Sequence, residues 1–198
     1  MKIAIFGGSF NPIHNAHIKL AQRFIDENCL DEVYFVPTYT TPLKDNSAVI
    51  SAEHRLYMCK LALKGYDKLL VSDVEIKRKG TSYSCDTIAH FKEQFPDAQL
   101  FFIMGADMFM TLESWRNFEY IFDNVTILSA PRDDDDYSDL LNKLCEYKKY
   151  SCKAHISKEY IEDLSSTMLR DMIKNNLDVS DYMNNAVIEY ITQNNLYR

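Results

Sequence analysis

Short apolar runs alternate with amphipathic stretches along the first two thirds of the chain, and this alternation restricts the folds that are open to it. The runs are rich in Ile, Val, Phe and Tyr and have few polar positions, which is typical of strands covered on both faces. The expected strands are Lys2–Phe6, Glu32–Val36, Leu69–Val74, Leu100–Met104 and Val125–Leu128, and the expected helices are Ala16–Glu27, Ala52–Leu63, Cys85–Gln94 and Met108–Phe122.

Strands that alternate with helices build parallel sheets with right-handed crossovers. We therefore expect an α/β fold with a doubly wound, Rossmann-like parallel sheet. The character of the chain changes after Leu128, and we expect a single domain over residues 1–198 with a small helical C-terminal subregion over about 160–198. The expected elements of this part are a solvated loop at Asp133–Asp136, a helix at Tyr137–Tyr147, a short strand near Ala154–Ile156, and helices at Ser165–Lys174 and Asn184–Thr192.

Composition excludes some classes of function. The formal net charge of -7 argues against a protein that binds nucleic acid, which would carry a basic face. The apolar run at residues 2–6 is too short for a signal peptide or a membrane span, so we expect a cytoplasmic protein with no membrane partner. The five cysteines form no CxxC pair and are expected to be reduced thiols rather than disulfides or a zinc site.

The first expected strand runs directly into Gly7-Gly8, with a helix starting near Asn15. Ligands of open α/β sheets bind beyond the carboxyl ends of strands, and paired glycines let a backbone approach a phosphate closely. A tight turn that simply needs glycine is an equal alternative for these two residues alone. The chain has no P-loop signature, and the dinucleotide-binding fingerprint fails because no third glycine opens the helix.

His14 and His17 are spaced so that both side chains can leave one face of a helix start. Structural histidines and a metal-binding pair are two alternatives, but the remaining histidines are scattered along the chain. Beside a helix N-terminus, imidazole N–H groups can bind a phosphate and stabilise the charge that develops as pyrophosphate leaves. This favours phosphate chemistry at the turn.

The segment Gly7-Gly8-Ser9-Phe10-Asn11-Pro12, followed by His14-Asn15-Ala16-His17, resembles the [TH]-x-G-H superfamily of nucleotidyltransferases. Ala16 stands where that superfamily has glycine, and its methyl group narrows the approach to a nucleotide. The resemblance implies that Gly7, Gly8, Ser9 and Phe10 belong to the ATP-binding residues, together with His14 and His17.

Ser165-Ser166-Thr167-Met168-Leu169-Arg170 precedes a helical pattern near the C-terminal end. An ordinary N-cap is the simpler explanation, because Ser and Thr accept hydrogen bonds from first-turn amides. The segment also matches the second signature of the same superfamily, S-S-T-x-[IL]-R. That match implies a phosphate site formed by Ser166, Thr167 and Arg170, in which the planar guanidinium binds phosphate oxygens. The expected catalytic residues are therefore His14, His17 and Arg170.

The middle of the chain is similar to the bacterial nicotinate-mononucleotide adenylyltransferase family. The similarity rests on Thr81–Thr87, Phe102–Met108, Trp115 and Arg132 in this order, and on the end Asn195-Leu196-Tyr197-Arg198. It extends from Lys2 to Arg198 and is weaker over about 133–164.

The resemblance assigns further site residues. Gly105 and Asp107, just after a strand end, are expected among the ATP-binding residues. Asp107 is expected to accept hydrogen bonds from the ribose of ATP, and the same residue can also be the N-cap of the next helix. Acceptor binding is expected at Trp115, which stacks on the pyridine ring, and at Ser84, which contacts the nicotinate carboxylate. Lys44 and Arg132 are expected near the acceptor phosphate, or are solvated surface charges.

The implied reaction transfers AMP from ATP to nicotinate mononucleotide, giving deamido-NAD and pyrophosphate in NAD biosynthesis. We expect Mg²⁺ to be carried by the ATP phosphates, with no metal ligands from the protein. Leu43 replaces a histidine of the family, and the acidic residues after Arg132 weaken the local positive field. These departures keep two alternatives open: a sister transferase acting on nicotinamide mononucleotide or phosphopantetheine, and a non-catalytic nucleotide sensor. The sequence also leaves a homo-oligomer open.

Overall fold

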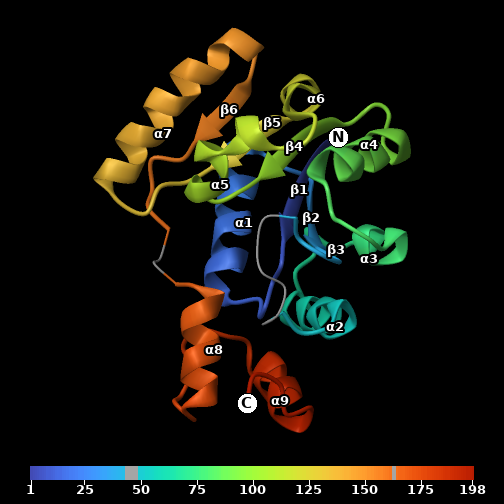
Figure 1. Cartoon of the computed structure of the whole chain (residues 1–198), viewed down its shortest axis with the longest axis vertical. Coiled ribbons are helices and arrows are strands. Elements are labelled where there is room, and N and C mark those ends of the chain that lie inside the picture. Colours follow the sequence, from blue (N-terminus) through green and yellow to red (C-terminus); the bar gives the residue numbers. More distant parts are fainter. Residues whose placement is uncertain (43–48, 162–163) are drawn as a thin grey trace.

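The computed structural model describes residues 1–42, 49–161 and 164–198, and within them six parallel strands form one sheet in the order β3-β2-β1-β4-β5-β6. The order reverses between β1 and β4, which makes this the switch point of a Rossmann-like fold. Figure 1 shows the sheet with helices on both sides. The strands are β1 (Lys2–Gly8), β2 (Glu32–Pro37), β3 (Leu69–Val71), β4 (Gln99–Ile103), β5 (Thr126–Ser129) and β6 (Lys153–Ile156).

Alternate residues of β1 face opposite sides of the sheet and belong to separate hydrophobic clusters. Ala4 and Phe6 join a cluster with the helices α1 (Asn15–Asn28), α2 (Ala52–Ala62), α8 (Ser166–Lys174) and α9 (Asn185–Gln193). Ile3 and Ile5 join the second cluster, which contains α4 (Ser84–Gln94), α5 (Ala106–Met110), α6 (Phe118–Asn124) and α7 (Asp134–Tyr147). This explains why Ile3 to Phe6 include no polar residue, since both faces of the strand are covered.

Most of the expected strands and helices are confirmed, but three expectations about these elements are wrong. The first is the strand Leu69–Val74. β3 ends at Val71, and Val74 already begins the short helix α3 (Val74–Arg78). Between the strand and this helix, the Ser72 hydroxyl accepts a hydrogen bond from the main-chain N–H of Val74 at 3.4 Å.

The single helix expected over Met108–Phe122 is the second wrong expectation. The chain forms α5, then the 3-10 turn η1 (Leu112–Ser114), and then α6. Trp115 takes an extended conformation, and Asn117 has a φ of 52° in the left-handed region. Asparagine tolerates this region better than most residues, so Asn117 allows the chain to turn between the two helices.

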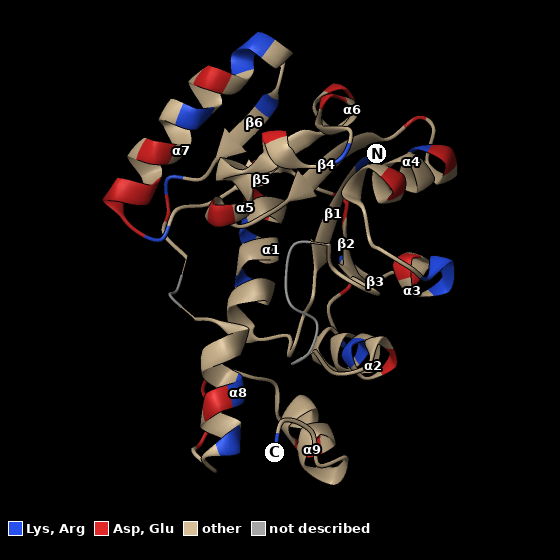
Figure 2. Cartoon of the chain, in the orientation of Figure 1, with Lys and Arg blue, Asp and Glu red and all other residues tan. Residues whose placement is uncertain are grey.

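The third wrong expectation is the solvated loop at Asp133–Asp136. Asp133 is the N-cap of α7 and its carboxylate accepts from the main-chain N–H of Asp136 at 2.8 Å. The remaining three aspartates form the first turn, where negative charge interacts favourably with the helix dipole. Figure 2 shows this acidic turn at one end of α7.

Two expectations from composition can be compared with the structure. The five cysteines are free thiols, as predicted. Over the described ranges, no helix combines the length and the apolar character that crossing a membrane requires.

Candidate active site

A cavity of about 710 Å³ opens at the carboxyl ends of β1 and β4, where the strand order reverses. This is the position at which open α/β sheets bind ligands. The cavity brings together most of the predicted site residues, although they come from opposite ends of the chain. The predicted residues that line it are Gly7, Gly8, Ser9, Phe10, His14, His17, Ser84, Gly105, Asp107, Trp115, Ser166, Thr167 and Arg170.

The turn after β1 is shaped by Phe10, which is buried and has a φ of 44°. A Cβ atom on Gly8 would lie 3.1 Å from the Phe10 ring, so glycine leaves room for that ring. The Phe10 ring in turn meets the imidazole of His17 edge-on, with centroids 5.1 Å apart. The second glycine of the turn therefore supports the placement of His17 through Phe10.

His14 occupies the N-cap position of α1 and His17 lies in its first turn. The two imidazole rings lie 3.7 Å apart between centroids with an angle of 32° between their planes. The main-chain N–H of His14 donates a hydrogen bond to Nδ1 of His17 at 3.3 Å. The predicted placement of both histidines on one side of the helix start is confirmed.

Burial lowers the pKa of His17 well below 6.5, and the neighbouring His14 lowers it further. His17 is therefore neutral at pH 7. A neutral imidazole has one donor and one acceptor nitrogen. Because Nδ1 accepts from His14, the proton resides on Nε2, and His17 offers a fixed N–H donor to a ligand in the cavity.

The N-terminus of α8 is bonded directly to the turn after β1. The Ser166 hydroxyl donates to the carbonyl of Pro12 at 2.9 Å, and Nη1 of Arg170 donates to the carbonyl of Asn11 at 2.9 Å. Ser165 is the N-cap, accepting from the Met168 N–H at 3.1 Å. Within the superfamily signature, Ser165 is therefore the N-cap, while Ser166 bonds to the turn after β1.

Arg55 supports two loops that line the cavity, and sequence reasoning missed it. It is 1% exposed and holds two loops together by donating to the carbonyls of Ser9 at 2.7 Å and Thr38 at 2.6 Å. It also donates to the carbonyls of Ile50 at 3.1 Å and Tyr39 at 3.2 Å. A signal was present, because Arg55 shares the buried face of α2 with Ala52, Met58, Cys59 and Ala62, where an unpaired cation is costly.

The end of the chain also reaches the turn. The Tyr197 hydroxyl donates to the side-chain carbonyl of Asn11 at 2.9 Å. Burial raises the pKa of Tyr197, so the hydroxyl keeps its proton and remains a donor. The resemblance at Asn195–Arg198 marked this segment, but its contact with Asn11 had no signal in the sequence.

Gly105 and Asp107 follow β4 on the other side of the switch point. Gly105 is the N-cap of α5, so the expectation that Asp107 itself caps the helix is wrong. A Cβ atom on Gly105 would lie 2.8 Å from Oδ1 of Asp107. Glycine at 105 thus allows the carboxylate to fold back over the helix start, where it lines the cavity.

Trp115 and Ser84 line the cavity on the side of α4 and η1. Trp115 is half-buried and meets Phe102 edge-on, with centroids 6.5 Å apart. Its Nε1 atom is buried and has no hydrogen-bond partner among the described residues. Ser84 is the first residue of α4. The tryptophan therefore belongs to the cavity wall as well as to the second hydrophobic cluster.

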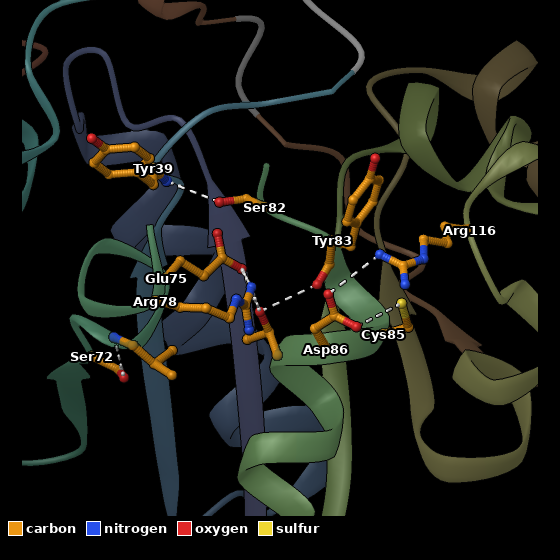
Figure 3. A network of polar contacts seen from close by, with 11 residues as sticks. Tyr39, Ser72, Glu75, Arg78, Ser82, Tyr83, Cys85, Asp86 and Arg116 are labelled. Atoms are coloured by element: carbon orange, nitrogen blue, oxygen red, sulfur yellow. Dashed lines mark hydrogen bonds and ion pairs between the residues drawn. The ribbon is translucent and has the colours of Figure 1, made fainter. Parts of the chain in front are cut away.

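A buried network fixes the segment before Ser84. The Thr87 hydroxyl donates to Glu75, which is 4% exposed, at 2.5 Å. Ser82 accepts from the main-chain N–H of Tyr39 at 2.9 Å and donates its own main-chain N–H to the Thr40 carbonyl at 2.8 Å. Figure 3 shows Glu75 and Ser82 between Tyr39 and the start of α4. Burial raises the pKa of Glu75.

The two predicted acceptor cations, Lys44 and Arg132, have different outcomes. Lys44, with Leu43, lies outside the described residues. Arg132 is not among the described lining residues; its Nε donates to Oδ2 of Asp136 at 2.7 Å. This hydrogen bond lowers the pKa of Asp136. In this structure Arg132 therefore neutralises part of the acidic turn that follows it.

The described part of the chain contains no group of three or more His, Cys, Asp and Glu residues arranged to hold a metal ion. Within the described residues, His14 and His17 therefore do not belong to a metal-binding group of this kind. The carboxylates that line the cavity, Asp107 and Glu75, come from different elements.

Comparison with known proteins agrees with this geometry. The Cytidylyltransferase-like family model matches residues 5–172. A relative from Lachnoclostridium phytofermentans, described as a "probable nicotinate-nucleotide adenylyltransferase", is 34% identical over 99% of this chain and 98% of its own length. A Clostridium botulinum protein of the same description is 39% identical over 98% of both chains.

Among solved structures, the fold is similar to that of Plasmodium falciparum nicotinic acid mononucleotide adenylyltransferase complexed with NaAD. The TM-score is 0.78 at 22% identity, covering 99% of this chain and 97% of that chain. The fold, the family model and the full-length relatives agree, and the chain belongs to the Cytidylyltransferase-like family and, within it, to the nicotinate-nucleotide adenylyltransferases.

Proposed function

We propose that this protein transfers the adenylyl group of ATP to nicotinate mononucleotide, producing deamido-NAD and pyrophosphate for NAD biosynthesis. The observation that carries the proposal is the direct bonding of two distant signatures around one cavity. Arg170 and Ser166 of α8 hydrogen-bond to the carbonyls of Asn11 and Pro12, in the turn that presents the histidines. The relatives described above carry the same activity in their names.

In the reaction, a phosphate oxygen of nicotinate mononucleotide attacks the α-phosphorus of ATP. The new P–O bond joins the two nucleotides, and the bond from the α-phosphorus to the bridging oxygen breaks. The electron pair of that bond leaves with pyrophosphate. A phosphate monoester is already a nucleophile, so the protein contributes positioning and electrostatic stabilisation.

His17 supports this step as a neutral donor. Its Nε2–H binds an oxygen of the α-phosphate as negative charge builds up, and His14 provides the adjacent imidazole. Arg170 follows the N-terminus of α8 by one turn and binds the departing pyrophosphate, with Ser166 and Thr167 at the helix start. Asp107 accepts from the ribose hydroxyls of ATP. On the acceptor side, Trp115 stacks on the pyridine ring and Ser84 contacts its carboxylate.

The residues present fit a Mg²⁺ ion that enters with ATP and is held by phosphate oxygens and water. The cavity offers separate carboxylates rather than a metal cage, which suits a cation with a strong preference for water and phosphate ligands. When bound, the ion neutralises charge on the leaving pyrophosphate. Among the described residues, Asp107 lines the cavity and would contribute to holding the ion through a bound water.

A pyrophosphate-release assay with a panel of acceptors tests the proposal. Purified protein with ATP and Mg²⁺ should release pyrophosphate with nicotinate mononucleotide, and the dinucleotide product should appear in equal amount. A higher rate with phosphopantetheine would favour the sister transferase that Leu43 keeps open. ATP binding by calorimetry, without pyrophosphate release from any acceptor, would support a nucleotide sensor and contradict the proposal.

A further inference from the structure

Two full positive charges occur among the described residues that line the cavity, Arg170 and Arg116. Arg170 lies on α8 and bonds to Asn11 in the turn after β1, where the proposed function places the triphosphate. Arg116 lies between η1 and α6, directly after Trp115. The two cations therefore belong to different walls of the cavity, and Arg116 is not used by the reaction as described so far.

The guanidinium of Arg116 has a defined position, but the contacts that hold it there are weak. Its guanidinium carbon lies 4.6 Å from the centroid of the Tyr83 ring, and Nη1 lies 3.7 Å from Oδ2 of Asp86. The second distance is longer than a hydrogen bond. The side chains of Arg116 and Asp86 are 53% and 41% exposed, and such exposed pairs contribute little stability. Figure 3 shows Arg116 pointing toward Tyr83 and Asp86.

The neighbours of Arg116 suit a flat ring that carries an anionic group. Trp115, which directly precedes it, offers an aromatic surface in the cavity wall. Ser84, which follows Tyr83, offers a hydroxyl at the start of α4. A guanidinium is planar and can bind both oxygens of a carboxylate, whereas a carboxamide in the same place provides no charge and only one acceptor oxygen.

We propose that Arg116 is a specificity-determining residue that makes the acceptor site prefer a pyridine carboxylate over the corresponding carboxamide. Tyr83 holds the guanidinium by stacking, and Asp86 serves as its counter-charge when the site is empty. The acceptor carboxylate then replaces Asp86 as the nearest anion. This inference rests on the proposed function, because it concerns the acceptor of the same reaction.

The test compares kcat/KM for nicotinate mononucleotide and nicotinamide mononucleotide in wild type, Arg116→Gln, Arg116→Lys and Asp86→Asn. Arg116→Gln should reduce the preference for the acid about 10- to 100-fold, the range of one charge-assisted interaction of about 1.5–3 kcal/mol. The loss should appear in the KM of the acid, while the KM of ATP and the kcat/KM of the amide change by less than about twofold. Arg116→Lys should fall between the two, since it keeps the charge without the planar fork.

Asp86→Asn should act in the opposite direction and increase the preference for the acid, because it removes the competing anion. Lys77→Gln is the control, since it removes one positive charge from a side chain that is 76% exposed and does not line the cavity. An unchanged acid-to-amide ratio in Arg116→Gln would overturn the inference. A wild-type protein that releases no pyrophosphate with either acceptor would instead overturn the proposed function, so the two failures are distinguishable.

Discussion

The main-chain N–H of His14 donates to Nδ1 of His17 at 3.3 Å, and this hydrogen bond fixes which nitrogen of His17 carries its proton. Two residues of one helix start thereby orient a single N–H donor through a main-chain hydrogen bond. A neutral donor of this kind can bind an anionic oxygen without bringing a mobile proton into the site. The chemistry of the turn thus depends on its backbone as much as on its side chains.

Replacing His17 by Ala should lower kcat by about 10²- to 10³-fold, the usual cost of removing one donor that stabilises a transition state. ATP affinity should fall by less than about fivefold, because the helix N-terminus and Arg170 still bind phosphate. Steady-state kinetics and calorimetry measure the two effects separately. His90→Ala is the control, since that histidine is exposed on α4 and does not line the cavity. Equal losses in turnover and in affinity would exclude the assigned role.

The lowered pKa of His17 also predicts a dependence of stability on pH. Below pH 6.5 the unfolded chain takes up a proton that the folded chain does not, because burial opposes the charged form. The lowered pKa of His17 therefore reduces the free energy of unfolding as the pH falls from about 6.5 toward that pKa. Well above pH 6.5 it has no effect on the free energy of unfolding.

Urea unfolding at pH 7.5 and 5.5 measures this contribution. His17→Asn should lose less free energy of unfolding between the two pH values than the wild type does. The exposed His90→Asn should match the wild type. If His17→Asn and the wild type lose the same free energy, burial of His17 does not control this part of the pH dependence.

Arg55 is predicted to support both the fold and the ATP site. In Arg55→Lys, one ammonium group cannot reach the carbonyls of Ser9, Thr38 and Ile50 at once. We expect a loss of about 2–4 kcal/mol in the free energy of unfolding, since a buried cation loses hydrogen-bond partners.

The KM for ATP should rise in the same variant, because the Ser9 loop lines the cavity. Lys60→Arg on the same helix is the control, since Lys60 is exposed and the change is equally conservative. A variant with unchanged stability and an unchanged KM would show that the four carbonyl contacts do not hold the loops.

The strands could be predicted from the sequence because both faces of β1 are covered, which leaves Ile3 to Phe6 without a polar residue. The helix ends were harder. The break after Ser114 depends on the left-handed conformation of Asn117, which an asparagine tolerates but does not require. The aspartates at 133–136 carry the same ambiguity, since a charge run suits a loop and a helix N-terminus equally well.

The candidate site was predictable where its residues belong to a local pattern, as His14 and His17 do. The contacts that sequence reasoning missed act over long separations on groups that have no sequence signature. Arg55 binds main-chain carbonyls, which every residue possesses, and Tyr197 reaches Asn11 across nearly the whole chain. Only the folded structure identifies such partners.

Gly105→Ala should isolate the contribution of Asp107 to ATP binding. The backbone at Gly105 has a φ of -70°, so alanine fits without strain, but its Cβ would lie 2.8 Å from Oδ1 of Asp107. The carboxylate must therefore move. We expect the KM for ATP to rise about 5- to 20-fold, corresponding to about 1–2 kcal/mol for one hydrogen-bonding group, with kcat and stability little changed.

A double-mutant cycle with Asp107→Ala distinguishes this cause from a general disturbance of the switch point. If Gly105→Ala acts through the carboxylate, it should add almost nothing to Asp107→Ala, because the group that it displaces is already gone. Additive increases in the KM for ATP would mean that Gly105 matters for another reason, such as the approach of the nucleotide to the start of α5. The non-additive result would support a ribose-binding role for Asp107, since displacement and deletion of the carboxylate would then weaken the same interaction with ATP.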